Sequence, residues 1–217
     1  MKDIIIDMPK LESPFVRKLN EKGDYLVTPE VAEGYEWVFS DEKVMAIEKL
    51  HGTNVSIVMQ NGQIAAIFNR TERIPFFNKG KRHIIDAVQE SWSRGYVDAL
   101  LDGQWFGEVV GPKVNGNPYG LKVHVWIPFS TFCQKHLRYK SWGKYPKDFA
   151  TISGWFKELM PLYSLMQGDG KQVKGSDGEV LGYQGFVEGI VFTHPDGRMA
   201  KLRRDMFDWY TGERHKE

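Results

Sequence analysis

The sequence predicts an α+β fold with mainly antiparallel sheets and flanking helices. Short apolar runs bounded by turn residues recur along the chain, as expected for buried or half-buried strands. Two longer stretches instead carry apolar residues at helical spacing. The 22 glycines and 10 prolines among 217 residues add many turns, which favours β structure. We expect residues 1–217 to form one domain, because this length supports a well-buried core.

Residues 1–43 are predicted to be a lead-in segment that packs on the same domain. Short strands are expected at 25–27 and 35–39, with Thr-Pro-Glu at 28–30 between them. The sequence shows neither a low-complexity linker nor an internal repeat. It therefore gives no reason to expect a separate N-terminal domain.

The stretch around Lys49 organises the rest of the chain. The apolar run 44–47 predicts a buried strand that ends close to this lysine. Further on, the runs 55–59 and 64–68 flank an Asn-Gly pair at 61–62, which is a strong β-hairpin signal. Lys49 is therefore expected at the rim of a sheet, where a strand runs into a Gly-containing turn.

Two helices and four further strands complete the expected fold. An apolar stripe predicts a helix over 83–101, and Asp148 is a suitable N-cap for a second helix over 149–166. The Gly-rich stretch 168–182 lacks the spacing of a Walker loop and is interpreted as a mobile surface loop. Residues 205–217 are expected to form a short helix or a tail. The remaining strands are expected at 104–111, 123–127, 185–192 and 199–203.

The composition is ordinary for a soluble globular protein, with 41% apolar and 26% charged residues. The net charge of +1 excludes strong binding of nucleic acid through overall charge, so such binding must come from local patches. A single cysteine, Cys133, excludes an internal disulfide and fits a reducing cytoplasm; we interpret it as a small core residue. The chain shows no signal peptide, and no apolar run approaches the ~20 residues of a membrane span.

Four short motifs place a charged residue at a strand end, beside small or apolar residues. In chain order they are KLHG at 49–52, FGE at 106–108, EGIV at 188–191 and KLR at 201–203. Lysine attacks only as the free base, and lowering its pKa from about 10.4 to about 7 requires roughly 4.6 kcal/mol. Partial burial and nearby cations can supply this energy. A lone lysine would be interpreted as a snorkelling residue, but the other motifs favour a nucleophile.

The order of these motifs resembles that of the covalent nucleotidyltransferases, which include polynucleotide ligases and mRNA capping enzymes. Their motifs are Lys-x-Asp/His-Gly, an aromatic residue with Gly-Glu, Glu-Gly-hydrophobic-Val, and Lys-x-Lys. Histidine in the first motif, followed by Gly-Thr-Asn at 52–54, is most similar to the phage-type RNA ligases that seal nicks in double-stranded RNA. The resemblance covers about residues 44–205 and implies a nucleotidyltransferase domain, the ATP-grasp-like adenylation domain of ligases.

The resemblance implies a catalytic role for four residues. Lys49 would attack the α-phosphate of ATP, release pyrophosphate and carry AMP as a phosphoramidate. Glu188 would help to hold a divalent metal ion, Mg²⁺ or Mn²⁺. Lys201 and Arg203 would pair with the α-phosphate and keep Lys49 deprotonated by like-charge repulsion.

The resemblance also implies a nucleotide-binding set. Glu48 would contact the adenine, Trp126 would stack on it, and Glu108 would hold the ribose hydroxyls. Asn54 and Arg70 match positions that the family uses around the nucleotide and in the later nucleic-acid steps. Displacement at a triphosphate independently requires cations on the developing charge, carboxylates for Mg²⁺ and a rigidly aimed nucleophile.

Several of these residues also have structural interpretations. Glu108 and Glu188 are typical of solvent-facing strand positions, and residues 201–204 are typical of a solvated charge run. His51 is interpreted as a turn residue rather than a catalyst, because the family accepts Asp there. Arg203 replaces the second Lys of the last motif, which keeps the charge but changes its geometry. Because only 14 residues follow Arg203, we expect a minimal core without the C-terminal accessory domain of many relatives.

Two stretches, 70–82 and 135–145, interleave basic and aromatic residues. Basic side chains suit phosphates and aromatic rings suit stacking on bases, as in sites for single strands or strand ends. A solvated face with half-buried aromatic residues is the alternative for each stretch. The predicted nucleic-acid contacts are Arg70, Arg73, Lys79, Lys81, Arg82, Arg138 and Lys140.

Together, the residues and the resemblance predict an ATP- and Mg²⁺-dependent RNA ligase. AMP would pass from ATP to Lys49, then to a 5′-phosphate end, and would leave when a 3′-hydroxyl attacks. The alternatives are a minimal DNA ligase, a GTP-using capping enzyme, a nucleotide- or RNA-binding module, and an adenylating subunit that needs a separate RNA-binding partner. The expected protein is a cytoplasmic, phage-like monomer that acts on RNA or DNA ends or nicks.

Overall fold

The computed structural model describes residues 5–163, 172–178, 180–183, 185 and 187–214. The chain divides into two compact units. Unit 1 combines residues 1–9 with 50–137, and unit 2 combines residues 10–49 with 138–217. Each unit contains its own antiparallel sheet together with short helices, so the predicted α+β class is confirmed. Whether the two units act as one domain stays a prediction.

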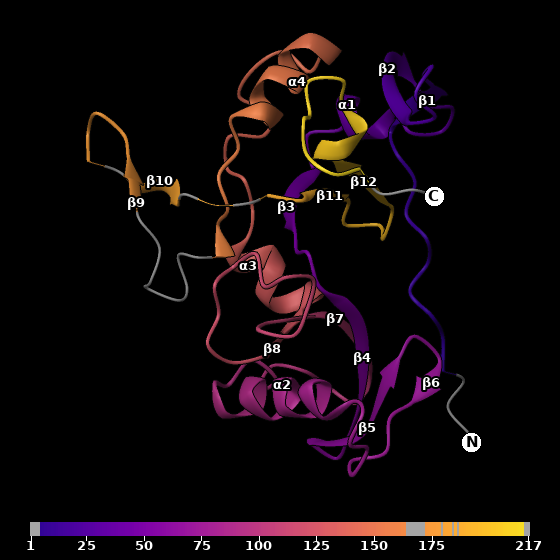
Figure 1. Ribbon diagram of the computed structural model, residues 1–217, viewed down its shortest axis with the longest axis vertical. Helices are drawn as coiled ribbons and strands as arrows, with labels where there is room; N and C mark the ends of the chain where they lie inside the picture. Colours follow the sequence, from indigo (N-terminus) through magenta and orange to yellow (C-terminus); the bar gives the residue numbers. More distant parts are fainter. Residues whose placement is uncertain (1–4, 164–171, 179, 184, 186, 215–217) are drawn as a thin grey trace. The chain divides into compact units, whose positions relative to one another are not determined.

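Unit 1 is built on a five-stranded antiparallel sheet (Figure 1). Its β-hairpin turns at Asn61 and Gly62, whose φ angles of 52° and 70° fit the type I′ turn that Asn-Gly favours. The predicted hairpin is therefore confirmed. In spatial order the strands are β6 (Glu72–Arg73), β5 (Gln63–Asn69), β4 (Thr53–Gln60), β7 (Gly103–Val110) and β8 (Val125–Pro128).

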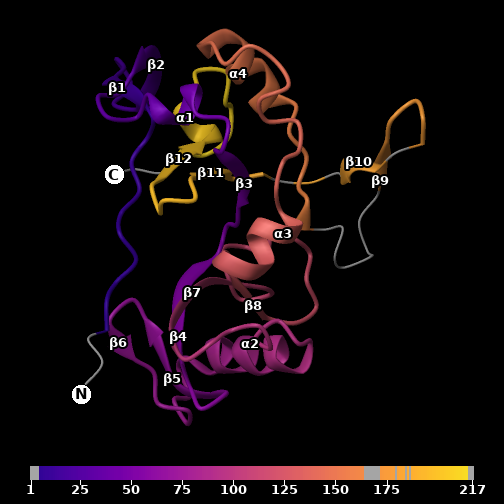
Figure 2. The ribbon, with the colours of Figure 1, turned by 180° about the vertical axis from the view of Figure 1, so that it is seen from behind.

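One face of this sheet is covered by α2 (Arg82–Ser93), as both ribbon views show (Figures 1 and 2). The hydroxyl of Ser91 joins the helix to β8 by accepting from the Trp126 N–H at 2.8 Å and donating to the Trp126 carbonyl at 2.6 Å. The helix ends eight residues earlier than predicted because Gly95 follows in the left-handed region, at φ 74°. The core between helix and sheet includes Val55, Ile57, Ile67, Ile84, Ile85, Val88 and Trp126.

Unit 2 is built on a three-stranded antiparallel sheet with β11 in the centre. Its apolar face packs against an aromatic-rich core that includes Phe15, Trp37, Phe156 and Phe207. The strands are β12 (Met199–Arg203), β11 (Gly189–Thr193) and β3 (Met45–Lys49). The unit also contains the hairpins β1 (Phe15–Leu19) with β2 (Tyr25–Val31) and β9 (Gln172–Lys174) with β10 (Val180–Tyr183), and the helices α1 (Trp37–Ser40) and α4 (Phe149–Lys157).

Some predicted elements differ in type or length. The strand expected at 35–39 is wrong, because Trp37–Ser40 forms the single-turn helix α1. The strand expected at 25–27 continues through Pro29 as β2. Asp148 caps α4 as predicted, its Oδ1 accepting from the Thr151 N–H at 2.9 Å, but that helix ends at Lys157 rather than 166.

The remaining predictions concern loops and the membrane. Part of the loop 168–182 lies outside the described residues, and its described parts include β9 and β10. Cys133 lies in a short π-helical turn, Phe129–Cys133, directly before α3 (Gln134–His136), and is buried as predicted. Across the described ranges, none of the helices combines the length and apolar character that spanning a bilayer requires.

Candidate functional site

The sheet of unit 2 places three basic residues on one face. Lys49 is paired with Gly189, which is paired with Arg203, while Lys201 is paired with Val191 in the adjacent row. Paired residues on neighbouring strands share a face, and so do residues two apart along a strand. Lys49, Lys201 and Arg203 therefore project from the same face, which we call the cation face. Gly189 has no side chain, so the row leaves space between the other two residues.

The nucleophile predicted from the first motif is held by a carboxylate. Lys49 Nζ donates to Glu188 Oε2 at 2.7 Å, and the Glu188 side chain is only 8% exposed. A buried carboxylate is costly unless it is paired, so this ion pair stabilises both charges. The same contact occupies the nitrogen that would have to attack. An attack by this nitrogen would first have to break its contact with Glu188.

The other two basic residues reinforce the positive field of the cation face. Burial, followed by the nearby charges of Arg203 and Lys49, lowers the pKa of Lys201 below its usual value. Arg203 is held in place by the buried Asp205, whose Oδ1 accepts from Arg203 Nε at 3.0 Å. Arg138 adds a fourth cation, because its backbone forms a bridge with Ile47, in the row next to Lys49.

Glu48 lies on the opposite face of β3 from Lys49, in the row of Ile190 and in the core of unit 2. Its Oε2 accepts from the backbone N–H groups of Leu162 and Tyr163. Oε1 is buried and has no hydrogen-bond partner among the described residues. Burial raises the pKa of Glu48 to about 8, against the lowering effect of the two N–H donors. Glu48 is therefore a buried carboxyl group that keeps its proton more readily than an exposed one and has one oxygen without a partner among the described residues.

In unit 1, Asn54 and Glu108 are direct cross-strand neighbours on β4 and β7, and Ile127 on β8 completes their row. These side chains share the sheet face that does not pack against α2. Two of the predicted nucleotide-binding residues are thus brought together, on what we call the Glu108 face.

Trp126 lies on the other side of this sheet. It is paired with Val109, has no exposed surface and donates from Nε1 to the Val55 carbonyl at 2.9 Å. Its ring also fills the space beside Gly107, where a Cβ atom would come within 2.6 Å of the indole. The structure contradicts the prediction that Trp126 stacks on a base next to Glu108, because the indole packs beneath α2 as part of the core.

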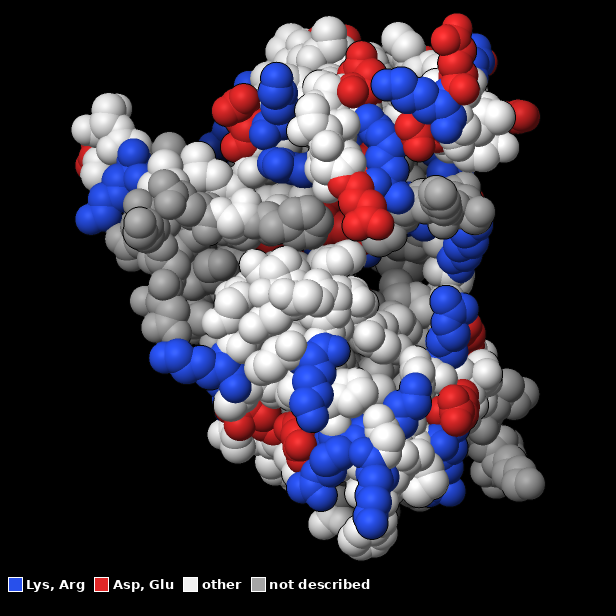
Figure 3. Space-filling model, viewed as in Figure 1, with Lys and Arg blue, Asp and Glu red and all other residues white. Residues whose placement is uncertain are grey.

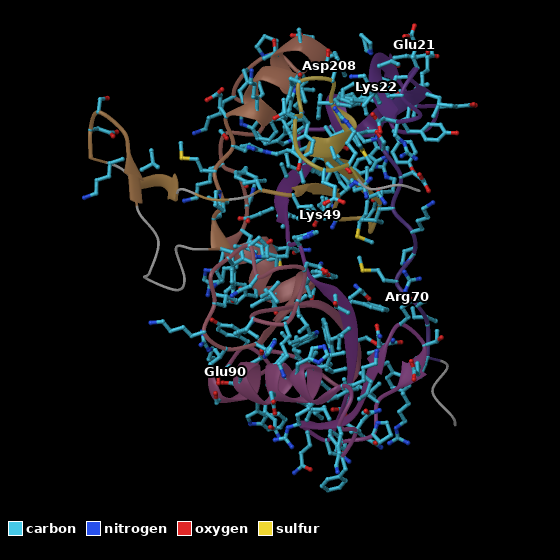
Figure 4. All side chains as sticks on the ribbon, viewed as in Figure 1. Glu21, Lys22, Lys49, Arg70, Glu90 and Asp208 are labelled. Atoms are coloured by element: carbon cyan, nitrogen blue, oxygen red, sulfur yellow. The ribbon has the colours of Figure 1, made fainter. Side chains whose placement is uncertain are left out.

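The N-terminal segment lies against the Glu108 face. Ile6 exchanges two backbone hydrogen bonds with the Gln104 amide, at 3.0 and 2.8 Å. Asn54 Nδ2 lies 3.4 Å from the sulfur of Met8, and an Arg70 nitrogen lies 3.6 Å from an Asp7 oxygen. Figure 4 labels Arg70, which occupies the tight turn between β5 and β6 at φ 55°. Asn54 and Arg70 are thus both contacted by this segment.

The turn that follows Lys49 contains His51 and Gly52 of unit 1, and a loop of unit 1 holds it in place. The His51 N–H donates to the Tyr119 hydroxyl at 2.6 Å, and Asn115 Nδ2 donates to the Gly52 carbonyl at 2.9 Å. A Cβ atom at Gly52 would come within 2.3 Å of the Val109 carbonyl, so only glycine fits. The backbone contact of His51 agrees with its interpretation as a turn residue.

The two basic-aromatic stretches differ in whether their aromatic rings are buried or exposed. In 135–145, Tyr139 is buried, and Trp142 and Tyr145 pack against Trp155. These rings belong to the core of unit 2, which favours the half-buried alternative, although Arg138 and Lys140 are exposed. In 70–82, by contrast, the rings are exposed.

Several contacts of the site could not be found from local sequence signals. The backbone amides that hold Glu48 come from 162–163, and the hydroxyl that holds His51 comes from Tyr119. Asp205, which orients Arg203, lies only two residues along the chain; its acidic side chain next to a basic motif was the one available signal.

The sequence model of the RNA ligase family matches residues 42–208, which is most of the chain. The chain belongs to the RNA ligase family. All four motifs lie within the matched range, together with the cation face and the Glu108 face. No match was found among curated proteins.

Solved structures of an RNA ligase from Naegleria gruberi are similar to this RNA ligase family member. One point mutant without ligand matches at 13% identity over 92% of this chain and 56% of that chain, with a TM-score of 0.47. A complex with pyrophosphate matches at 13% identity over 93% of this chain and 58% of that chain, with a TM-score of 0.45. A point mutant with ATP and Mn matches at 13% identity over 91% of this chain and 60% of that chain, with a TM-score of 0.43. The chain thus spans less than two thirds of these ligases.

The carboxylates of the described residues bear on whether the site could hold a metal ion. Among the described residues, no group of three or more His, Cys, Asp or Glu side chains is placed to hold a metal ion. A single carboxylate beside the nucleophile still suits Mg²⁺ or Mn²⁺, because Mg²⁺ keeps several waters and binds through one or two carboxylates plus substrate phosphates. Glu188 therefore fits a metal that arrives with a triphosphate.

Proposed function

We propose that this RNA ligase family member is an ATP-dependent RNA ligase that forms a covalent lysyl-AMP on Lys49. The observation that carries the proposal is the cation face, where the sheet register aligns Lys49, Lys201 and Arg203 beside the buried Glu188. This face combines an amine, a carboxylate and two further cations. Attack on an α-phosphate requires all of these groups.

The first step begins with Lys49 and Glu188. A divalent cation bound at Glu188 with phosphate oxygens would neutralise charge on the triphosphate. Loss of the contact between Glu188 Oε2 and the ammonium frees Lys49 to release a proton to solvent water. Its lone pair then forms the bond to the α-phosphorus while the bond to the bridging oxygen breaks, and pyrophosphate leaves. Lys201 and Arg203 face the same space and oppose the return of a positive charge to Lys49.

The nucleotide-binding residues are proposed on chemical grounds. Glu108 and Asn54, as cross-strand neighbours, offer acceptors and donors to ribose hydroxyls. Glu48 stays the proposed adenine contact through its Oε1, which has no hydrogen-bond partner among the described residues. Arg70 is proposed for the phosphates of the nucleotide or of the RNA end. Arg73, Lys79, Lys81, Arg82, Arg138 and Lys140 remain the proposed RNA contacts.

Intact mass after incubation with ATP and Mg²⁺ tests the proposal. The wild-type chain should gain one adenylate, Lys49→Ala should gain none, and Lys43→Ala, an exposed lysine of the same unit, should behave like the wild type. If the folded wild-type protein gained no mass even after treatment with pyrophosphatase, it would not adenylate itself, and the proposal would be wrong. A binding module, or a subunit that depends on a partner, would then be the better interpretation.

The acceptor requires a second experiment. Sealing of nicked RNA, DNA and hybrid duplexes, and of single-stranded ends, separates an RNA ligase from a minimal DNA ligase. Nick sealing in double-stranded RNA, as in the phage-type enzymes, is the proposed outcome. Labelling by GTP in place of ATP would instead indicate a capping enzyme.

A further inference from the structure

An apolar pocket lies on the α2 side of the unit 1 sheet, away from the Glu108 face. It has a volume of about 310 Å³ and lies between α2 and β5, the strand next to the short edge strand β6. Its floor is formed by Ile64 and Ile67 from β5 and by Ile85 and Val88 from α2. None of the motifs contributes to it. The pocket is therefore separate from the groups assigned to nucleotidyl transfer.

The entrance of this pocket is aromatic. Phe76 and Trp92, which both line the pocket, are 44% and 41% exposed, and the neighbouring Phe77 is 94% exposed. Gln89 adds one side-chain amide to the lining. Large apolar side chains grouped at a surface indicate a binding site more often than single ones do. The entrance thus offers flat rings and an amide that can read the edge of a ligand.

The surroundings of the pocket are positively charged. Residues 70–82 carry five basic side chains and one acidic side chain. The nearest acidic residues of α2 are neutralised, since Asp86 pairs with Arg82 at 2.7 Å and Glu90 pairs with Arg94 at 2.8 Å. In the space-filling view, Lys and Arg side chains gather over the part of unit 1 that holds β5, β6 and α2 (Figure 3).

We propose that this pocket, the Phe76 pocket, receives one unstacked base of the RNA strand, with the adjoining phosphates on Lys79 and Lys81. The proposal rests on the proposed function, because it names a second contact for the same substrate. Bases that leave a helix are held in proteins by stacking on aromatic rings, while basic side chains follow the backbone. The exposed rings and surplus charge of residues 73–82 provide both.

The size and charge of the pocket favour a base over a protein partner. A volume of about 310 Å³ is at the lower limit of ligand pockets, which span ~300–1,000 Å³. It can hold one ring system, but not the row of side chains that a docked helix inserts. A basic rim around an apolar floor also matches a base flanked by phosphates.

Fluorescence anisotropy with a labelled single-stranded RNA tests the proposal. Phe76→Ala and Trp92→Ala should each weaken binding by about fivefold to 150-fold, the range of one base–aromatic stack. Leu101→Ala, an apolar residue that is 76% exposed in the same unit but does not line the pocket, should leave the affinity within twofold. Unchanged affinity in both pocket variants would overturn the proposal and favour a protein ligand.

A series of RNAs, each with one base removed, provides a second and independent measurement. For the wild type, removal of the base at one position should weaken binding as much as Trp92→Ala does. The Trp92→Ala protein should lose no further affinity on that RNA, because the same contact has already been lost. Equal losses for both proteins at every position would overturn the proposal. Lys81→Ala should reduce the salt dependence of binding by about one phosphate contact.

The adenylation assay separates this proposal from the proposed function. Phe76→Ala and Trp92→Ala should form lysyl-AMP from ATP at the wild-type rate, since the pocket takes no part in that step. If the wild type forms no lysyl-AMP but its RNA affinity depends on Phe76 and Trp92, the ligase proposal fails and the pocket remains an RNA site. If lysyl-AMP forms and RNA binding ignores these residues, only the pocket proposal fails.

Discussion

The two sheets of this protein are both antiparallel but carry different sets of charged side chains. The unit 2 sheet gathers like charges, Lys49, Lys201 and Arg203, and two buried carboxylates, Glu188 and Asp205, pair with two of them. The unit 1 sheet instead places one carboxylate, Glu108, beside the amide of Asn54 and the apolar Ile127. Repulsion among the cations of the first face opposes its two ion pairs and lowers the pKa of Lys201, whereas the second face is close to neutral. The comparison indicates that electrostatic strain is concentrated where the chemistry is proposed to occur.

The largest expected effect lies in the core behind the Glu108 face. Trp126→Ala should lower the free energy of unfolding by about 3–5 kcal/mol, because the indole is fully buried and its Nε1 is hydrogen-bonded. Urea denaturation measures this loss. If Trp126→Ala lowered the free energy of unfolding by less than about 1 kcal/mol but weakened ATP binding, Trp126 would be a stacking residue rather than a core residue.

The next largest effect concerns the carboxylate of the cation face. Glu188→Gln removes the negative charge beside Lys49 but keeps the shape of the side chain, so adenylation should slow by about 10²–10³-fold. Single-turnover formation of lysyl-AMP measures the rate. Glu21→Gln, an exposed carboxylate of the same unit, is the matched control (Figure 4). If Glu188→Gln retained more than a tenth of the wild-type rate, the cation face would not need its carboxylate.

The third prediction concerns how the free energy of unfolding depends on pH through Glu48, which lies on the face of β3 opposite the cation face. The folded-state pKa of Glu48, about 8, exceeds its ordinary value of 4.5, so the folded protein holds an extra proton between these pH values. This contribution is complete below pH ~4.5 and is lost as the pH rises towards 8, by about 1.4 kcal/mol per pH unit. Unfolding at pH 5, 6.5 and 8 should show a steeper decline for the wild type than for Glu48→Gln. Parallel declines would contradict the burial of this proton.

The smallest effect is expected on the Glu108 face. The pair of Asp7 with Arg70 is long, at 3.6 Å, and Arg70 is largely exposed. Asp7→Asn should therefore change the free energy of unfolding by less than about 1 kcal/mol, as for other surface ion pairs. Calorimetric titration with ATP shows whether the released Arg70 then binds more tightly. A large loss of stability would mean that the N-terminal segment is a structural part of unit 1.

The residues of the cation face were predicted from the sequence through the family resemblance of the four motifs. Lys201 and Arg203 are two residues apart, so any strand places them on one face. The four motifs therefore predicted the residues of this face before their pairing was known, although the pairing of β3 with β11 rather than with β4 required the structure.

The error at Trp126 has the opposite cause. β8 is buried on both faces, with Val125, Trp126 and Ile127 all fully inaccessible, so the sequence carries no polar alternation to identify the side of each residue. A shift of one residue along such a strand moves a side chain to the other face. Helix ends failed differently, since the left-handed Gly95 ended α2 inside a stripe that continued to satisfy the helical period.

The alternation of faces along β12 also makes the length of this strand functionally significant. One additional residue between Lys201 and Arg203 would turn Arg203 towards the core and carry Lys201 and Arg203 to opposite sides of the sheet. Two additional residues would restore the common face, at the cost of a bulge. In the turn between β11 and β12, at 194–198, an insertion of either size leaves this arrangement unchanged. Tolerance to insertion should therefore depend on odd or even length inside the strand and be indifferent to it in the turn.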